Sequence, residues 1–368
     1  MSRRALFLFP SDRMSGAERV TLMVAKEAAV SGYFDHIDCY IQCWPRTGTL
    51  DELGKLANVV LHYSGAATHI KGLIPSARFM MRQSYDLVFS SITHLNLLAS
   101  LLRVLGLLST KRLVTRESTD VFNRDFGLIT PLIRMMYCTY CAQDLIICQT
   151  ERMLASFNYH TNNRYKEKSK IIPNPIDMER ITTASASAPP EIIMQLPPNR
   201  TKVIWCGRFV QVKSPIRAIR TLRAIHDMGR TDIHLVMVGD GPLKDEVELA
   251  TSQLRLSGHV TLIGYHPAPA TIMARCDLGL LTSDKEGFPN VILEMLASGV
   301  RSVVTTDCAG GLCEIPSVKL SDTVTSSALA KQLYSVLTEP QAKETGRYLA
   351  GRKPDVFWQT IIKYCMHN

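Results

Sequence analysis

The strongest constraint on the fold comes from residues 276–299, which contain three short pieces of different character. An apolar run, CDLGLLT, is followed by a polar loop and then by a nearly all-apolar segment that starts at Pro289 and stops at Gly299. Proline suits a first helical turn, and glycine suits a helix end. The pattern predicts a buried strand, a loop and a buried helix, which is the repeating unit of an α/β fold with a doubly wound parallel sheet.

Two carboxylates interrupt this stretch. Glu286 lies in the loop and Glu294 lies one turn into the apolar helix, where burying an unpaired charge costs several kcal/mol. Open α/β sheets bind ligands where strand carboxyl ends meet helix amino termini, and the free amides there favour phosphate. A nucleotide-diphosphate sugar would suit the two carboxylates as well as the free amides. Its ribose would bind Glu294, and a sugar hydroxyl would bind Glu286. A solvated loop carboxylate and a helix carboxylate paired with a nearby arginine are the alternative.

The segment EGFPNVILEMLASG, which holds both carboxylates, resembles the signature of the family 4 retaining glycosyltransferases (glycosyl transferases group 1), which use nucleotide sugars. The resemblance implies the GT-B fold: two facing Rossmann-like, doubly wound domains with a C-terminal crossover helix. It also implies that this segment binds the sugar donor, through Glu286, Gly287, Phe288, Pro289, Asn290 and Glu294.

Two cations further up the chain fit the same family. The predicted strand 203–209 contains Gly-Arg near its end, and Lys213 follows Arg208 by five residues. An arginine fork and a lysine point charge at a strand end can clamp a pyrophosphate, and the pair resembles the family's GR…K pattern. Gly241, in the turn after the predicted strand 234–238, matches the family's strand that passes near the base and phosphate. The resemblance therefore adds these three residues to the donor site.

Two residues of the amino-terminal half extend the predicted site. Gly16 lies in a loop after the predicted strand 5–9 that resembles the family's glycine-rich first loop, although Ser15 replaces one glycine. The resemblance implies that the Gly16 backbone approaches the donor, and a simple tight turn is the alternative. His94 follows the predicted strand 87–90, where the family places a donor-site histidine and where an imidazole can exchange a proton with an acceptor. A structural histidine is the alternative there.

The implied reaction transfers a sugar with retention at the anomeric carbon, without a bound metal or another cofactor. Arg208 and Lys213 would neutralise the departing pyrophosphate in place of Mg²⁺. Glu286 would bind the sugar, and the leaving phosphate would help to deprotonate the acceptor. The single C-x-x-C pair, at positions 138 and 141, has no second pair or nearby histidines, so we expect no zinc site. The expected catalytic residues are Glu286, His94, Arg208 and Lys213.

At 368 residues the chain is too long for one ordinary core, so we expect two domains. The ten cysteines are scattered, many of them in apolar runs, which indicates a reducing, cytoplasmic setting. We expect an acceptor-side Rossmann-like domain over 1–177, an Ala/Ser/Pro-rich linker over 178–200, a nucleotide-sugar-binding Rossmann-like domain over 201–350 and a helix over 351–368 that returns to the first domain.

The charge of the chain points to an anionic partner. The net charge is +9, and residues 1–177 contribute 21 Lys and Arg against 15 Asp and Glu. No nucleic-acid-binding motif accompanies these cations, so we expect no nucleic acid and favour an anionic membrane surface or a phosphorylated acceptor. Leucines in residues 95–108 repeat at helical spacing beside basic residues. This helix is either core or a peripheral contact with the inner face of a membrane. No stretch predicts a membrane span.

Together these features predict a retaining, metal-independent glycosyltransferase of the hexosyltransferase type, which moves a sugar from a nucleotide-diphosphate sugar to a glycan acceptor. A lipid-linked oligosaccharide in surface polysaccharide assembly is the expected acceptor. Two alternatives are a sugar-nucleotide epimerase or hydrolase of the same fold, and a non-catalytic scaffold subunit that binds nucleotide sugars.

Overall fold

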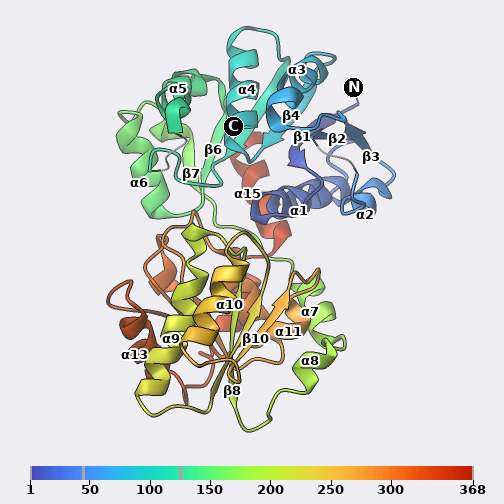
Figure 1. Cartoon of the computed structure of the whole chain (residues 1–368). Helices are drawn as coiled ribbons and strands as arrows, with labels where there is room; N and C mark the ends of the chain where they lie inside the picture. The colour runs from blue at the N-terminus through green and yellow to red at the C-terminus, as the bar shows by residue number, and fades with distance from the viewer. Residues whose placement is uncertain (1, 44–45, 124–126, 367–368) are drawn as a thin grey trace. The chain divides into compact units, whose positions relative to one another are not determined.

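The computed structural model describes residues 2–43, 46–123 and 127–366, and the chain forms two compact units (Figure 1). Unit 1 comprises Met1–Pro175 and Arg352–Asn368, and unit 2 comprises Ile176–Gly351. The chain therefore passes from unit 1 to unit 2 and back. Residues 367 and 368, at the end of the predicted terminal helix, lie outside the described residues.

The stretch 178–200, which the sequence suggests as a linker, lies inside unit 2. A side-chain oxygen of Asp177 accepts a hydrogen bond from the backbone N–H three residues later, and this caps a helix that begins at residue 178. Ile181 and Ile193 are buried in the core of unit 2, so these residues are packed rather than extended over the surface. The two helices of the stretch are α7 (Met178–Ala186) and α8 (Glu191–Met194).

Unit 1 is built on a seven-stranded parallel sheet with the order β3-β2-β1-β4-β5-β6-β7. Its central strands are continuous apolar runs because helices cover both faces of the sheet. The order reverses between β1 and β4, and open α/β sheets bind ligands at such a switch point. The strands are β1 (Arg4–Ser11), β2 (His36–Cys43), β3 (Val59–Tyr63), β4 (Tyr85–Ser90), β5 (Thr110–Arg116), β6 (Leu145–Cys148) and β7 (Ser169–Ile171).

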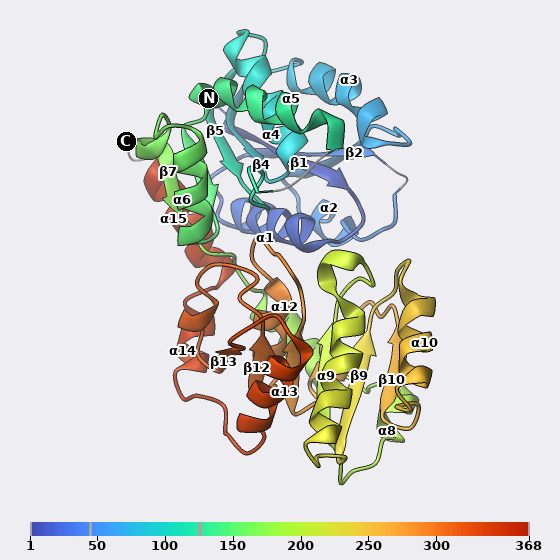
Figure 2. The ribbon, with the colours of Figure 1, turned by 60° about the vertical axis from the view of Figure 1, so that its left-hand side comes forward.

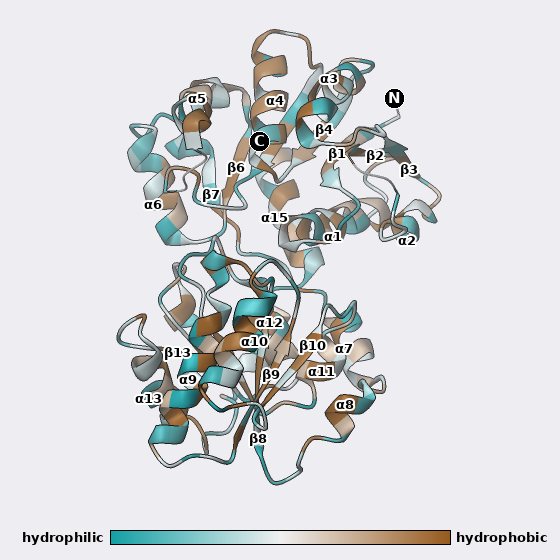
Figure 3. Cartoon of the chain, in the orientation of Figure 1, coloured by the Kyte–Doolittle hydropathy of each residue, from teal (hydrophilic) through white to brown (hydrophobic). Residues whose placement is uncertain are grey.

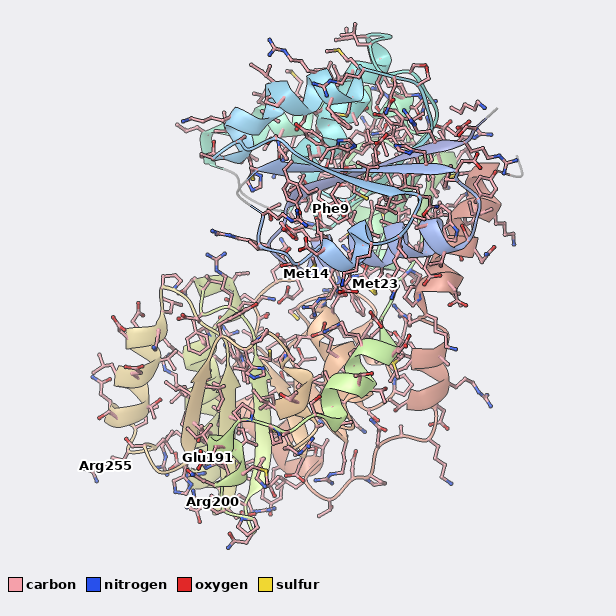
Figure 4. The ribbon with its side chains drawn as sticks, turned by 90° about the vertical axis from the view of Figure 1, so that its right-hand side faces the viewer. Phe9, Met14, Met23, Glu191, Arg200 and Arg255 are labelled. Carbon is pink, nitrogen blue, oxygen red and sulfur yellow. The ribbon has the colours of Figure 1, made fainter. Side chains whose placement is uncertain are left out.

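Helices pack on both faces of the unit 1 sheet. One face packs against the first helix, and Figure 4 labels two residues of this core, Phe9 from β1 and Met23 from α1. Phe79 and Leu95 belong to a separate core on the other face. The helical elements are α1 (Gly16–Val30), α2 (Asp51–Gly54), α3 (His69–Met80), α4 (Thr93–Val104), η1 (Gly127–Ile129), α5 (Thr130–Met136), η2 (Tyr137–Ala142), α6 (Glu151–His160) and η3 (Lys166–Lys168).

The last helix, α15 (Pro354–Met366), belongs to unit 1 although it follows unit 2 in the sequence. Figure 1 shows it in red beside the blue α1. Trp358 and Ile361 are buried, and the ring centroid of Trp358 lies 6.1 Å from that of Phe34. The helix thus completes the hydrophobic core of unit 1.

Unit 2 is built on a six-stranded parallel sheet with the order β10-β9-β8-β11-β12-β13. Its order reverses between β8 and β11, which makes this the switch point of unit 2. The strands are β8 (Thr201–Cys206), β9 (Ile233–Val238), β10 (Val260–Gly264), β11 (Leu278–Leu281), β12 (Ser302–Thr305) and β13 (Val318–Leu320).

Two hydrophobic cores cover the faces of the unit 2 sheet. Ile219 and Leu333 come from helices on one face, part of which Figure 2 shows in front of the strands. Ile181 and Leu293 come from helices on the other face. Besides α7 and α8, the helical elements are η4 (Gln211–Lys213), α9 (Pro215–Asp227), α10 (Lys244–Gln253), α11 (Ala270–Met273), α12 (Asn290–Ala297), η5 (Leu312–Glu314), α13 (Ser326–Ser335) and α14 (Thr345–Ala350).

The predicted α/β class with two doubly wound, Rossmann-like sheets is confirmed. The leucine-rich stretch 95–108 overlaps α4, which Figure 3 shows as largely hydrophobic. Leu95, Leu97, Leu102 and Leu108 are buried, so most of the stripe is core, whereas Leu105 and Leu107, just beyond α4, are 59% and 49% exposed. Within the part of the chain that the structure describes, we find no helix with the length and apolarity needed to cross a bilayer.

Candidate functional site

Most of the predicted site residues lie at the switch point of unit 2. The chain that leaves β8 carries Arg208 and then Lys213, the last residue of η4. The chain that leaves β11 carries Glu286 and then enters α12. Because β8 and β11 are neighbours in a parallel sheet, their carboxyl ends place these two loops side by side.

Two glycines hold the loop after β8 in place. Gly239 and Gly241 have φ angles of +144° and +156°, which L side chains rarely adopt. A Cβ atom on Gly241 would lie 2.6 Å from the carbonyl oxygen of Phe209, and one on Gly239 would lie 1.8 Å from that of Gly207. The Phe209 N–H also donates to the carbonyl oxygen of Asp240 at 2.9 Å. The turn after β9 therefore fixes the backbone on both sides of Arg208, and this close approach is a role for Gly241 that needs no ligand.

Lys213 and Glu286 are bound to each other. Lys213 Nζ lies 2.5 Å from Glu286 Oε1, and the hydroxyl of Ser283 donates to the same oxygen at 2.7 Å. The side chain of Glu286 is only 13% exposed. Its backbone N–H donates to the carbonyl oxygen of Cys308 at 2.8 Å, which ties the loop to the chain after β12. The carboxylate is thus a fixed acceptor at the end of the sheet.

The backbone around Lys213 is held as firmly as its side chain. The hydroxyl of Thr282 is placed to donate to the carbonyl oxygens of Lys213 and Ser214, at 3.0 and 2.9 Å, and accepts from the indole N–H of Trp205 at 2.9 Å. Ser214 has a φ of +46°, and α9 begins at the next residue. A residue held in this sparsely populated conformation is typical of functional sites.

Arg208 differs from Lys213 in being exposed. Among the residues that the structure describes, no carboxylate forms an ion pair with its guanidinium group. Arg208 therefore presents an uncompensated positive charge on the same loop as Lys213. Such a group can bind an anion through two parallel hydrogen bonds.

Glu294 lies on α12 near an arginine. Its Oε1 is 3.7 Å from Nη2 of Arg180 on α7, and its side chain is 12% exposed. The pairing with an arginine, one of the alternatives stated above, is thus present in the structure. Ile292, Leu293, Met295 and Leu296 are buried around it, so α12 is the apolar helix that its sequence predicts.

The approach to α12 contains the other predicted donor residues. Pro289 is buried and stands immediately before the helix, whose first residue is Asn290. Gly287 and Phe288 precede it in the loop, and Phe288 packs against the hydrophobic core under α12. Gly299 has a φ of +97° just beyond the end of the helix, as expected for a helix stop.

The remaining predicted residues, Gly16 and His94, lie at the switch point of unit 1. Gly16 is the first residue of α1, which follows β1, and His94 is in the first turn of α4, which follows β4. Glu18 is buried in the same turn as Gly16 and accepts hydrogen bonds from the hydroxyls of Ser11 and Ser15. Burial raises the pKa of Glu18 above its ordinary value. Ser15, which stands where the related loop has a glycine, therefore binds this carboxyl group.

His94 is held in its neutral form. Its Nε2 lies 2.6 Å from Oε1 of Gln42, at the end of β2, and Nδ1 of His69 lies 3.1 Å from the same oxygen. An amide oxygen only accepts, so Nε2 of His94 and Nδ1 of His69 each carry a proton. Burial, and then the neighbouring His69, lowers the pKa of His94 to about 4. Its Nδ1 is therefore an unprotonated acceptor at neutral pH.

The structure brings the predicted residues together in two groups, one in each unit. Two partners were not predicted: Ser283 for Glu286 and Gln42 for His94. An arginine partner for Glu294 was one of the alternatives, and the structure identifies it as Arg180, within the stretch 178–200 that the sequence suggests as a linker. No group of three or more His, Cys, Asp or Glu side chains in the described ranges could hold a metal ion.

The chain is similar to known glycosyltransferases. The model of the family described as glycosyl transferases group 1 matches residues 192–347. The chain is 26% identical over 239 residues to an uncharacterized glycosyltransferase of Methanocaldococcus jannaschii, a match that covers 64% of this chain and 58% of that protein. It is 28% identical over 235 residues to the N-acetylgalactosamine-N,N'-diacetylbacillosaminyl-diphospho-undecaprenol 4-alpha-N-acetylgalactosaminyltransferase of Campylobacter jejuni, with 62% and 60% covered.

The chain thus spans about three fifths of the length of these curated relatives. Among solved structures, it is similar to the HepE protein of Anabaena in complex with UDP and glucose. The TM-score is 0.78, the identity is 18%, and 98% of each chain is covered. At this level of identity the likeness concerns the fold.

Proposed function

Residues 192–347 are a glycosyl transferases group 1 domain in a chain with the GT-B fold, and from this premise we propose that the protein is a glycosyltransferase that takes its sugar from a nucleotide-diphosphate sugar. The observation that carries the proposal is the group at the switch point of unit 2. It combines an uncompensated cation, Arg208, with a second cation, Lys213, that is hydrogen-bonded to Glu286. These groups suit a diphosphate and the hydroxyls of a sugar.

The two cations supply the electrostatic part of the proposed reaction. The bond between the anomeric carbon and the donor phosphate breaks, and negative charge develops on the leaving diphosphate. Arg208 and Lys213 stabilise that charge without a metal ion, because preformed charges at a site cost no reorganisation during the reaction. The ion pair of Lys213 with Glu286 brings the second cation to this position.

We propose retention of configuration at the anomeric carbon. The acceptor hydroxyl attacks from the side that the phosphate leaves, and its proton passes to a phosphate oxygen. Glu286 then serves as an acceptor for a sugar hydroxyl, since Ser283 and Lys213 already occupy one of its oxygens. The second carboxylate, Glu294, accepts hydrogen bonds from the ribose beside Arg180.

A lipid-linked oligosaccharide in surface polysaccharide assembly is the proposed acceptor. The Campylobacter jejuni relative has a diphospho-undecaprenol compound in its name, and the excess of cations in the amino-terminal half suits a phosphorylated acceptor. We propose that unit 1 binds this acceptor and that the unprotonated Nδ1 of His94 takes part. The proposed location is the cytoplasmic face of a membrane.

Thermal unfolding in the presence of nucleotide sugars tests the donor site. A ligand that binds the native state raises the melting temperature by mass action. We expect one class among UDP-, GDP-, ADP- and CDP-sugars to stabilise the wild-type protein. Glu294→Ala should lose this response, whereas Glu248→Ala, which changes an exposed carboxylate on α10, should keep it.

A transfer assay with the donor that stabilises the protein then tests catalysis. Transfer of labelled sugar to a lipid-linked glycan, with retained configuration in the product, supports a transferase. Consumption of donor without transfer would point to an epimerase or hydrolase instead. Absence of any stabilisation in the folded wild-type protein would reject the donor site.

A further inference from the structure

Helix α3 exposes a stripe of large aliphatic side chains on unit 1. Ile70 is 81% exposed, Ile74 is 65% exposed and Met81, at the carboxyl end of the helix, is 41% exposed. At 3.6 residues per turn these three side chains lie within about 40° of one another around the helix axis. Scattered exposed apolar residues are ordinary, but an aligned group of them marks an interaction surface.

Three exposed cations lie directly beside this stripe. Around the same helix axis, the angle from Ile70 is about 80° to 120° for these cations, which are Arg78, Lys71 and Arg82. None of them forms an ion pair with any residue in the described ranges. The sequence also contains no Asp or Glu between Glu52 and Asp86. The cations are therefore available to an anionic partner.

The opposite side of α3 is fully used in packing. Phe79 and Met80 are buried in the core of unit 1, and Ser76 is buried with them. Gly72 lies so close to the end of β2 that a Cβ atom would come within 2.6 Å of the carbonyl oxygen of Gln42. The helix is thus fixed on the sheet, and its exposed stripe has no further role in that core. Figure 3 shows both hydrophobic and hydrophilic segments on this helix.

We propose that this face of α3 docks on an anionic lipid bilayer. Its aliphatic stripe would enter the interface between headgroups and acyl chains, while the three cations would contact the negatively charged headgroups. A 12-residue helix that carries both kinds of side chain on adjacent arcs has the chemistry of an interfacial helix. The docking does not depend on the proposed transfer reaction.

The distribution of charge between the units favours a membrane over a second copy of the chain. Unit 1 holds 24 Lys and Arg against 15 Asp and Glu, which gives +9, whereas unit 2 holds 18 of each and is neutral. The whole net charge of the protein thus resides in the unit that carries α3. Two such surfaces would repel each other, but a negatively charged bilayer would attract them.

The position of α3 connects this surface with the candidate site of unit 1. His69 is the first residue of α3, and its backbone carbonyl oxygen accepts a hydrogen bond from Nε2 of Gln42 at 3.1 Å. The oxygen of the same Gln42 side chain, Oε1, accepts the hydrogen bond from His94. Ile70, which follows His69, is the most exposed residue of the stripe. A bilayer at α3 would therefore lie next to the part of unit 1 that contains His94.

Sedimentation with lipid vesicles tests the proposal. The probe is the full-length protein with vesicles of phosphatidylcholine, with and without phosphatidylglycerol. Ile70→Ser with Ile74→Ser removes most of the stripe and leaves the charges, whereas Lys71→Gln with Arg78→Gln and Arg82→Gln removes the charges and leaves the stripe. The matched control is Ile192→Ser with Met194→Ser on α8 of the neutral unit 2, where these side chains are 46% and 69% exposed.

We expect the wild-type protein to bind only the vesicles that contain phosphatidylglycerol, and to be released by high salt. Both α3 variants should bind at least about tenfold more weakly. The charge variant loses three cations, each of which contributes about 1 kcal/mol near such a surface, and the Ile70 and Ile74 variant loses the apolar area that enters the bilayer. The α8 control should bind like the wild-type protein. Circular dichroism and the melting temperature establish that each variant is folded.

Three results would overturn the proposal. One is that the folded wild-type protein ignores anionic vesicles. Another is that the α3 variants bind as tightly as the α8 control, which would assign the contact to a different surface. The third is a wild-type dimer that dissociates when Ile70 and Ile74 are replaced, because α3 would then cover a second copy of the chain.

Discussion

Lys213 Nζ and Glu286 Oε1 lie 2.5 Å apart, and they join the loop after β8 to the loop after β11 at the switch point of unit 2. Each group compensates the charge of the other. The proposed diphosphate would compete with Glu286 for Lys213. Substitution of Lys213 and substitution of Glu286 should therefore have different effects on donor binding.

Lys213→Met removes a cation that the diphosphate needs, and should raise the donor dissociation constant about tenfold or more. Glu286→Gln leaves Lys213 available to phosphate, so donor affinity should persist while the transfer rate falls about a hundredfold through the lost sugar contact. Calorimetric titration and steady-state kinetics separate these effects. Lys331→Met, an exposed lysine on α13, is the control. Equal losses of affinity in both variants would contradict these separate roles.

The contribution of Arg208 to donor binding should depend on the geometry of its guanidinium group as well as on its charge. Arg208→Met is expected to weaken donor binding about 10- to 100-fold, the range of a charge-assisted bidentate contact. Arg208→Lys keeps the charge but loses the planar fork, so it should recover only part of that affinity. Full recovery by lysine would show that charge alone is required.

The stability of the protein should depend on pH through His94. The pKa of His94 is about 4 in the folded protein, below its ordinary value of 6.5, so the unfolded chain binds a proton more readily between these values. The resulting stabilisation is present above pH 6.5 and is lost as the pH falls towards 4, and a pKa difference of this size corresponds to about 3 kcal/mol. Urea unfolding of wild type and His94→Gln measures the difference. Parallel pH profiles would contradict the prediction.

Gly241 should be required for the fold of unit 2 whether or not a donor is bound. Gly241→Ala would place a Cβ atom 2.6 Å from the carbonyl oxygen of Phe209 at a φ of +156°. We expect a loss of about 2 kcal/mol or more in the free energy of unfolding. Gly258→Ala is the control, because a Cβ atom there would meet nothing within 4 Å. Similar unfolding midpoints for the two variants would show that the loop after β8 can move.

The sequence predicts the sheets better than it predicts the partners within the site. Apolar runs such as the one in β9 identify strands because both faces of a parallel sheet are buried. The edge strands β7 and β13 were not predicted, since each has only three residues and includes polar ones. Gln42 was not predicted as a partner of His94 because their contact depends on how β2 and α4 pack, and nothing in their local sequence reports it.

The leucine-rich helix α4 also shows that the sequence does not determine which face of a helix is covered. Helical spacing in α4 correctly indicates a helix, but a leucine stripe looks alike whether it faces a core or a lipid. On α3, Ile70 and Ile74 are exposed whereas Phe79 and Met80 are buried, and the sequence of the helix does not predict this difference. Spacing gives the face of a helix, and tertiary packing decides which face is covered.

The return of α15 to unit 1 has a consequence for the order of events during synthesis. Unit 2 is a continuous segment and can fold as soon as it leaves the ribosome, whereas the core of unit 1 lacks Trp358 and Ile361 until the last helix emerges. For that interval the first-made half of the protein has an open apolar face on α1. A nascent chain stalled shortly before residue 354 should therefore recruit chaperones through the part of the protein that was translated first.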